Sequence, residues 1–211
     1  MPPANKMIPK FLMEIITVID KYVIEAQTKA VIVSGTGRHF SSGADIDQLL
    51  NFVVSESTYK DYEIVNYPDW YIKCKKAFLS LSDKNVPVIS LIKGFCIGSG
   101  FELALSSHIR ICEKNAQIAL PESTFGLLPG VNGTLKMCEN IGCVKAFDLI
   151  FRGAFINEDE ALDIGLIDCV VRKKESLECA KKFVDYIETN DIIYKKENAK
   201  KIFSDFCQRI S

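Results

Sequence analysis

The sequence predicts a single α/β domain, and two observations carry that prediction. Helical and strand patterns alternate along the 211 residues, which is typical of the α/β class. Residues 86–92 (VPVISLI) form a nearly continuous apolar segment, as expected for a strand buried on both faces of a parallel sheet. A chain of this length buries one core well and two cores poorly, so we expect one domain.

Helices and strands follow one another through the first part of the chain. Apolar residues at helical spacing predict an amphipathic helix over 10–27, and aromatic-rich stretches divided by Pro68 predict two helices within 47–82. The segment GSG at 98–100 leads from the central strand into a helix over 101–107. The predicted strands are residues 29–34, 86–92, 109–112, 117–120 and 166–171.

The C-terminal half continues with a loop and further helices. Glycine and proline indicate a loop over 121–133, and the sequence NEDE at 157–160 is typical of a capping box that opens a short helix ending at Gly165. Apolar stripes over 175–188 and 195–210 predict two amphipathic tail helices.

Charge and hydropathy exclude several classes of partner. Lys and Arg number 26 against 27 Asp and Glu, so no basic surplus favours nucleic acid or an anionic membrane. Apolar runs are far shorter than the roughly 20 residues that a membrane span needs. No apolar h-region follows the N-terminal lysines, so we expect no secretory signal and a cytoplasmic protein.

Cysteine and histidine offer little for metal or nucleophilic chemistry. The eight cysteines are scattered through apolar stretches without metal-ligand spacing, so we expect reduced, buried thiols and no metal site. Only two histidines, His39 and His108, are present, and we expect structural roles for both. The HExxH, GxSxG, P-loop and GxGxxG motifs are all missing from the sequence.

Two loop-to-helix junctions share one design, with small residues at a turn before a helical segment. They are FSSGADI at 40–46 and GSGFE at 98–102. The first N–H groups of a helix lack intrahelical partners and point toward the positive end of its dipole. If the fold brings the two junctions together, two N–H groups can converge on one oxygen and stabilise an enolate-like oxyanion.

Each candidate residue also has a plain structural interpretation. Ser99 and Glu102 have the spacing of a capping box, in which their side chains only close the start of a helix. Glu122, in LPES at 120–123, could be a solvated carboxylate at the end of a strand. Taken singly, neither glutamate is diagnostic of catalysis.

In combination the motifs are specific. The order FSSGADI, GFCIGSGFELA, ALPESTFGLLPGVNGTLKM and GAFINEDEALDIGLIDCVV closely resembles the crotonase, or enoyl-CoA hydratase/isomerase, superfamily, from about Pro2 to Val171. The resemblance implies a spiral of β/β/α units with C-terminal helices. It implies a core over 1–173 and a helical tail of the same domain over 174–211, and relative to the family both ends look shortened.

The resemblance also implies residue roles. The family's AGAD and GGG-x-E segments match 42–45 and 98–102, so the backbone N–H groups of Ala44 and Ser99 would form an oxyanion hole. Serine stands at position 99, where the family usually has glycine. The two carboxylates of the hydratases match Glu102, which would activate water, and Glu122, which would be the acid/base at the α-carbon.

The substrate implied by the resemblance is an acyl thioester of coenzyme A, which arrives as substrate, with no further cofactor. Residues 49–71 would line the acyl pocket. The residues expected to bind the substrate are Ser42, Gly43, Asp45, Ile46 and Gly98.

Because both carboxylates are present, the resemblance favours hydration of an α,β-unsaturated acyl-CoA. Isomerisation, decarboxylation and thioester hydrolysis use the same oxyanion hole and stay open, as does a non-catalytic subunit that binds acyl thioesters. The apolar stripe Ile202, Phe203, Phe206 and Ile210 must be buried against the chain's own core or a neighbour. With the family's usual assembly, this stripe favours a homotrimer or hexamer.

Overall fold

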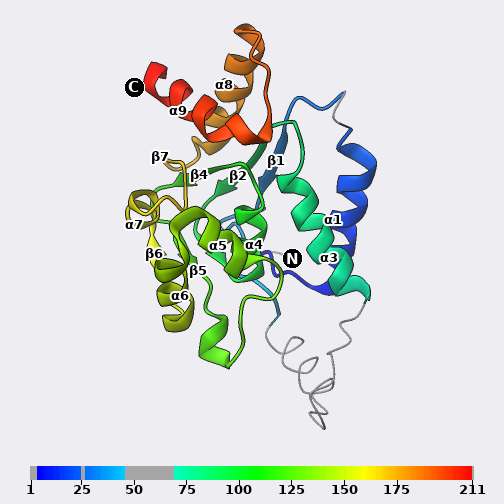
Figure 1. Cartoon of the computed structure of the whole chain (residues 1–211), viewed down its shortest axis with the longest axis vertical. Helices are drawn as coiled ribbons and strands as arrows, with labels where there is room; N and C mark the ends of the chain where they lie inside the picture. The colour runs from blue at the N-terminus through cyan, green and yellow to red at the C-terminus, as the bar shows by residue number, and fades with distance from the viewer. Residues whose placement is uncertain (1–3, 25–26, 46–68, 211) are drawn as a thin grey trace.

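The structure is a computed structural model, and it describes residues 4–24, 27–45 and 69–210 (Figure 1). Its α-helices are α1 (Pro9–Tyr22), α3 (Asp69–Ser82), α4 (Ser99–Leu105), α5 (Gly133–Ile141), α6 (Cys143–Arg152), α7 (Glu158–Asp163), α8 (Ser176–Thr189) and α9 (Ala199–Ile210). Its strands are β1 (Val31–Ser34), β2 (Val88–Ile92), β3 (Phe95–Ile97), β4 (Ile109–Glu113), β5 (Gln117–Ala119), β6 (Ile156–Asn157) and β7 (Cys169–Val171). Two short 3₁₀ helices are η1 (Glu122–Phe125) and η2 (Lys196–Asn198).

The strands form two sheets that the chain visits in turn. One sheet has the order β1-β2-β4-β7 with every pair parallel, and the other has the order β3-β5-β6. Each of β2 and β4 is followed directly by a strand of the second sheet, and a helix comes next. This repeated β/β/α turn confirms the predicted fold class.

The central strand β2 is buried along its whole length, as its continuous apolar sequence predicts. Side chains alternate between the faces of a strand, so its two faces contact different parts of the core. Ile89 and Leu91 pack with α8 and α9, whereas Val88 packs with α1 and α3 and Ile92 packs between the two sheets. Figure 1 shows these helix pairs on different sides of the sheet.

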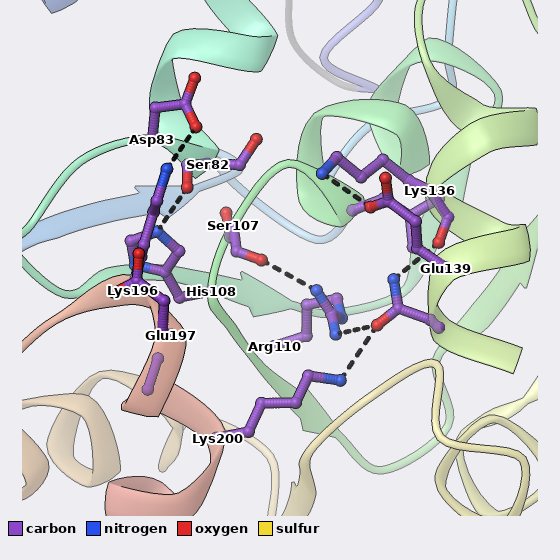
Figure 2. A pocket seen from close by; sticks show the side chains of 13 residues that line it. Ser82, Asp83, Ser107, His108, Arg110, Lys136, Glu139, Lys196, Glu197 and Lys200 are labelled. Atoms are coloured by element: carbon purple, nitrogen blue, oxygen red, sulfur yellow. Dashed lines mark hydrogen bonds and ion pairs between the residues drawn. The ribbon is translucent and has the colours of Figure 1, made fainter.

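A buried guanidinium group joins β4 to three other segments. Arg110 is 1% exposed. Its Nε donates to Leu166 O at 2.6 Å. Nη1 donates to Ser107 O at 2.9 Å and Nη2 donates to Asn140 Oδ1 at 3.0 Å (Figure 2). Nη2 also lies 3.6 Å from the Asp168 carboxylate, which balances the buried charge.

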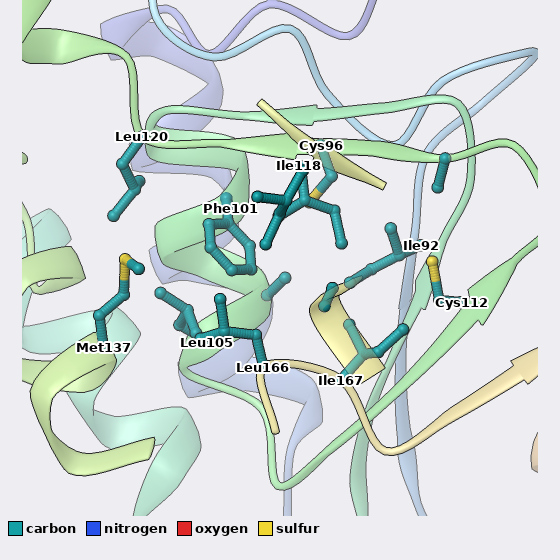
Figure 3. Close-up of a cluster of buried hydrophobic side chains, with 14 of the residues drawn as sticks. Ile92, Cys96, Phe101, Leu105, Cys112, Ile118, Leu120, Met137, Leu166 and Ile167 are labelled. Atoms are coloured by element: carbon teal, nitrogen blue, oxygen red, sulfur yellow. The ribbon is translucent and has the colours of Figure 1, made fainter. Parts of the chain in front are cut away.

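The core between the two sheets is built from β2, α4, β5 and the segment before β7 (Figure 3). Phe101 of α4 is 1% exposed and lies at its centre, with Ile92, Ile118 and Leu166 fully buried in the same cluster. This packing fixes the start of α4 relative to the ends of β3 and β5.

The tail helices pack onto the chain's own core. Ile202, Phe203 and Phe206 of α9 are 7%, 2% and 2% exposed, beside Phe183 of α8. Of the predicted stripe only Ile210 is exposed. The stripe is therefore satisfied within the chain and gives no support to a contact between subunits.

Local boundaries differ from the sequence-based expectations for physical reasons. The first helix ends at Tyr22, because the N–H of Val23 closes it on Ile19 O. The predicted loop over 121–133 contains η1. The sequence patterns predicted neither α5 nor α6. Gly142, with φ of +79°, separates α5 and α6. The first of the two helices expected within 47–82, the one before Pro68, lies outside the described residues, and α3 is the second.

Two further features concern the helices. The capping box at 157–160 is confirmed in its main contact, since the side chain of Asn157 accepts from Glu160 N at 2.9 Å. In the part of the chain that the structure describes, no helix is long and apolar enough to span a membrane.

We expect Arg110→Met to lower the free energy of unfolding by about 3–5 kcal/mol, because it leaves the carbonyl oxygens of Ser107 and Leu166 without their buried donor and removes the buried charge beside Asp168. Arg152→Met is the matched control, because Arg152 pairs with Asp148 on the exposed face of α6 and such pairs contribute about 0.5 kcal/mol or less. Urea unfolding of the three proteins measures the difference. Equal losses in both variants would contradict a structural role specific to Arg110.

Candidate active site

The two loop-to-helix junctions lie side by side. Ser41 and Cys96 form a parallel bridge, in which Ser41 N donates to Phe95 O at 2.9 Å and Ile97 N donates to Ser41 O at 3.0 Å. A Cβ atom on Gly43 would lie 2.8 Å from Ile97 O, and the φ of Gly43 is +83°. Only glycine meets both conditions without strain, so the close approach of the junctions depends on it.

Ser41 holds the first junction in shape, although the sequence analysis gave it no role. Its hydroxyl donates to Asn5 O at 2.8 Å and accepts from Gly43 N at 3.1 Å. A Cβ atom on Gly100 would lie 2.5 Å from Ser41 Cβ, so α4 also packs directly on this serine. The small residues of both motifs thus allow the two backbones to meet.

Residues 4–7 run beside the first junction. Ser42 N donates to Ala4 O at 2.8 Å, Met7 N donates to Gly43 O at 2.9 Å, and Met7 forms a parallel bridge with Ala44. Asp45 pairs with Lys6 at 3.0 Å. Ile46 and most of the expected acyl-pocket segment lie outside the described residues.

Glu122 approaches the second junction. It is the first residue of η1, and a Cβ atom on Gly98 would lie 3.1 Å from Glu122 Oε1 and 3.8 Å from the Cα atom of Gly43. The other carboxylate oxygen, Oε2, is buried without a hydrogen-bond partner in the described structure. Glu122 is therefore half-buried beside both glycines and is not a solvated carboxylate at a strand end.

Glu102 is buried on α4 and is held by the backbone of another segment. Its Oε1 atom accepts from Val131 N at 2.8 Å, Asn132 N at 3.0 Å and Gly133 N at 2.8 Å. A Cβ atom on Gly133 would lie 3.0 Å from both Cγ and Oε1 of Glu102, so glycine is needed for this approach. This partner segment was not predicted from the sequence, where its only signal is Gly133, the first residue of α5.

The capping-box interpretation of Ser99 and Glu102 is wrong. The N-cap of α4 is Gly98, with no side-chain cap, and the Glu102 carboxylate points to the loop before α5. Ser99 is the first residue of α4, where the backbone N–H has no intrahelical partner. Its hydroxyl oxygen is buried and has no hydrogen-bond partner among the described residues.

The two carboxyl groups influence each other's ionisation. Burial, and then the negative charge of Glu102, raise the pKa of Glu122 from 4.5 to about 7. Burial also raises the pKa of Glu102, while its three backbone hydrogen bonds oppose that shift. Two interacting carboxyls of this kind titrate as a pair, with one able to hold a proton near neutral pH.

Comparison with known proteins identifies the family. The family model described as enoyl-CoA hydratase/isomerase matches residues 1–205. The chain belongs to this family. Among its relatives is the short-chain-enoyl-CoA hydratase of Clostridium acetobutylicum, 34% identical over 180 residues, or 85% of this chain and 65% of the relative. Another is the peroxisomal bifunctional enzyme of Pongo abelii, 36% identical over 81% of this chain and 21% of the relative.

The fold of this hydratase/isomerase-family chain is also found among solved structures. The structure of Pseudomonas aeruginosa DspI matches with a TM-score of 0.76 and 28% identity, over 96% of this chain and 72% of that one. The aligned part of the chain covers 65% of the Clostridium acetobutylicum relative and 21% of the Pongo abelii relative, which is less than two thirds of the length of either.

The two histidines of this family member are structural, as the sequence predicts. His39 stacks on Phe95 at 4.7 Å and accepts from its N–H at 3.0 Å. His108 accepts from Val88 N at 3.3 Å, and its Nε2 lies 3.1 Å from Ser82 O. Within the described ranges, no three His, Cys, Asp or Glu side chains are arranged to hold a metal ion.

A polar cavity of about 660 Å³ lies away from the paired carboxyls, between α3, α5, η2 and α9 (Figure 2). None of the predicted site residues lines it. Its lysines are paired with carboxylates, which leaves no strong surplus of positive charge. The pairs are Lys136 with Glu139, Lys196 with Asp83 and Lys200 with Asp168.

The raised pKa of Glu122 predicts a stability that falls as the pH rises. The unfolded carboxyl loses its proton near pH 4.5 and the folded one near pH 7, so the free energy of unfolding decreases between these values. Glu122→Gln removes this titration, and we expect the variant to melt above the native protein at pH 8 and level with it at pH 4.5. Glu178→Gln on the exposed face of α8 is the control, since Lys182 lowers the pKa of Glu178. Calorimetry at both pH values makes the comparison, and a Glu122→Gln gain that is independent of pH would refute the cause.

Proposed function

We propose that the chain is an enoyl-CoA hydratase, which adds water to an α,β-unsaturated acyl-CoA thioester. The observation that carries the proposal is the pair of carboxyl groups, buried Glu102 and half-buried Glu122, next to the two loop-to-helix junctions in contact. The enoyl-CoA hydratase among the relatives supports the same substrate class.

The two carboxyls suit opposite proton transfers. Three backbone N–H groups favour the ionised form of Glu102, which would take a proton from the water that attacks the β-carbon. Glu122, with a pKa near 7, would then give its proton to the α-carbon. The sum of the two steps is one water added across the double bond, with the proton returned between the carboxyls through solvent.

The negative charge that develops on the thioester oxygen needs donors. We assign this role to the backbone N–H groups of Ala44 and Ser99, at the two junctions that meet at Gly43 and Gly98. Residues 42–46 would hold the coenzyme A portion, and the thioester would reach inward between the junctions. Coenzyme A would arrive as part of the substrate.

Incubation of the pure protein with crotonyl-CoA tests the proposal directly. Loss of the conjugated thioester absorbance with appearance of the 3-hydroxyacyl product supports a hydratase. A shifted double bond, free coenzyme A or released carbon dioxide would each favour one of the related enolate reactions instead. Binding without turnover would favour a non-catalytic subunit.

We expect Glu102→Gln and Glu122→Gln each to lower kcat by about 10²–10⁴-fold, because each carboxyl is assigned one proton transfer. A glutamine carbonyl can still accept the backbone N–H groups, so the fold should persist. Glu158→Gln is the matched control, since Glu158 is also buried and accepts from Asn115 N at 2.8 Å, outside the site. Normal turnover in either site variant would remove that residue from the mechanism.

Two substitutions of Ser99 distinguish the role of its backbone N–H from the role of its hydroxyl group. Ser99→Pro deletes the N–H, and we expect kcat to fall by about 10²–10³-fold, as for loss of one oxyanion donor. Proline is accepted at the first position of a helix, where Ser99 lies, so the fold should survive. Ser99→Ala keeps the N–H and should stay active in the same assay. Inactivity of a well-folded Ser99→Ala would show that the hydroxyl has a role of its own.

The assembly as a homotrimer or hexamer, expected from the family resemblance and the apolar tail stripe, and the cytoplasmic location, expected from the N-terminal sequence, both remain predictions. Light scattering at micromolar concentration measures the first, and a strict monomer would contradict it.

A further inference from the structure

The loop that holds Glu102 is itself held from the other side by α3. The hydroxyl group of Tyr71 donates to Gly130 O. A Cβ atom on Gly130 would lie only 3.0 Å from that hydroxyl oxygen, so a side chain here would crowd the contact. One helical turn further along α3, Lys75 O accepts from Asn132 Nδ2 at 3.4 Å. Helix α3 therefore contacts the loop at two points next to the donors of Glu102.

One peptide group connects Tyr71 to Glu102. The carbonyl oxygen of Gly130 accepts from Tyr71, and the N–H of Val131 donates to Glu102 Oε1 at 2.8 Å. Both belong to the peptide bond between residues 130 and 131. The C=O and N–H of a trans peptide point in opposite directions, so this group lies between α3 and α4. Hydrogen bonds in such a chain polarise and strengthen one another, so the Tyr71 hydroxyl supports the hydrogen bond to the carboxylate.

We propose that Tyr71 is a positioning residue for Glu102, which keeps the N–H of Val131 directed at the carboxylate and so maintains its ionised form. Tyr71 acts through the peptide group and transfers no proton itself. Its kinetic consequence rests on the proposed function, in which ionised Glu102 takes a proton from the attacking water. The sequence placed Tyr71 only at the end of the expected acyl-pocket segment, 49–71.

Several groups act on the ionisation of Glu102 from the elements around it. Burial raises the pKa of Glu102, whereas the N–H groups of residues 131–133 and the charge of Lys75 lower it. The charge of Glu102 in turn raises the pKa of Glu122 on η1. On α3, burial and then the charge of Glu102 raise the pKa of Cys74 to about 12, so this thiol stays neutral at physiological pH. The tyrosine hydroxyl on α3 reaches the carboxylate through the N–H groups.

Tyr71→Phe removes the hydroxyl group and keeps the ring. Carbon-13 NMR of the side-chain carboxyl groups follows the titration of Glu102 in the protein without substrate. We expect the pKa of Glu102 to rise, with its proton affinity about 3–10-fold higher, because a weakened hydrogen bond stabilises the ionised form less. The Val131 N–H signal should move upfield. A role in stability alone would lower Tm and leave this titration unchanged.

Tyr194→Phe is the matched control, because the Tyr194 hydroxyl is also hydrogen-bonded within the chain, 2.9 Å from His108 Nδ1 and outside the site. We expect the titration of Glu102 to be unchanged in this variant. Asn132→Ala removes the longer contact with α3 and keeps the backbone N–H. It should shift the Glu102 titration in the same direction as Tyr71→Phe, but by less.

The pH dependence of crotonyl-CoA hydration gives a second measurement. Because the base must be ionised, Tyr71→Phe should move the acid limb of kcat/KM to higher pH. Below that limb kcat/KM should fall by about 3–10-fold, in line with the proton affinity of Glu102, and at higher pH the loss should be smaller.

Two results would overturn the inference: an unchanged Glu102 titration in folded Tyr71→Phe, or an equal shift in Tyr194→Phe. If Tyr71→Phe does not fold, the native protein still decides, because the Val131 N–H and the hydroxyl-bearing ring carbon of Tyr71 should titrate together with Glu102. Absence of that coupling also overturns it. A shifted titration without crotonyl-CoA turnover would refute the proposed function alone, and normal turnover with an unshifted titration would refute this inference alone.

Discussion

The site depends on one buried carboxylate and the three backbone N–H groups that it accepts. Glu102 contributes an oxygen from α4, and residues 131–133 contribute the donors at the start of α5. A buried charge is tolerated only when hydrogen bonds replace its lost hydration. The same contact therefore positions the helix, orders the loop that follows η1 and orients the carboxyl group. A substitution that loosened it would act on all three.

Close backbone approach is the second constraint on the site, and glycine supplies it. Gly43 and Gly98 let the two junctions meet. Gly100 leaves space for the side chain of Ser41, and Gly133 leaves space for that of Glu102. These are contacts between segments that lie far apart in the chain. The site can form only because these positions have no side chain. This explains why its motifs are rich in small residues.

The sequence predicted the local features well and the distant contacts poorly. The α/β class, the central strand and the tail helices followed from periodicity, because apolar spacing is a property of a single segment, whereas the β/β/α spiral followed from the family resemblance. The role of Glu102 was ambiguous, because a capping box and a long-range carboxylate contact have the same local spacing. Only the placement of residues 131–133 separates them. Arg110 shows the same limit, since its charge gave no sign of the acceptors at Ser107 and Leu166.

The burial of β2 has a consequence for how the molecule opens. Val88 belongs to the cluster under α1 and α3, Ile89 and Leu91 to the cluster under α8 and α9, and Ile92 to the cluster between the sheets. One five-residue strand is therefore part of all three hydrophobic clusters formed by the described residues. Neither helix pair can leave without exposing a side chain of this strand to water. Its amides, paired on both sides with β1 and β4, should exchange hydrogen only when the whole domain unfolds.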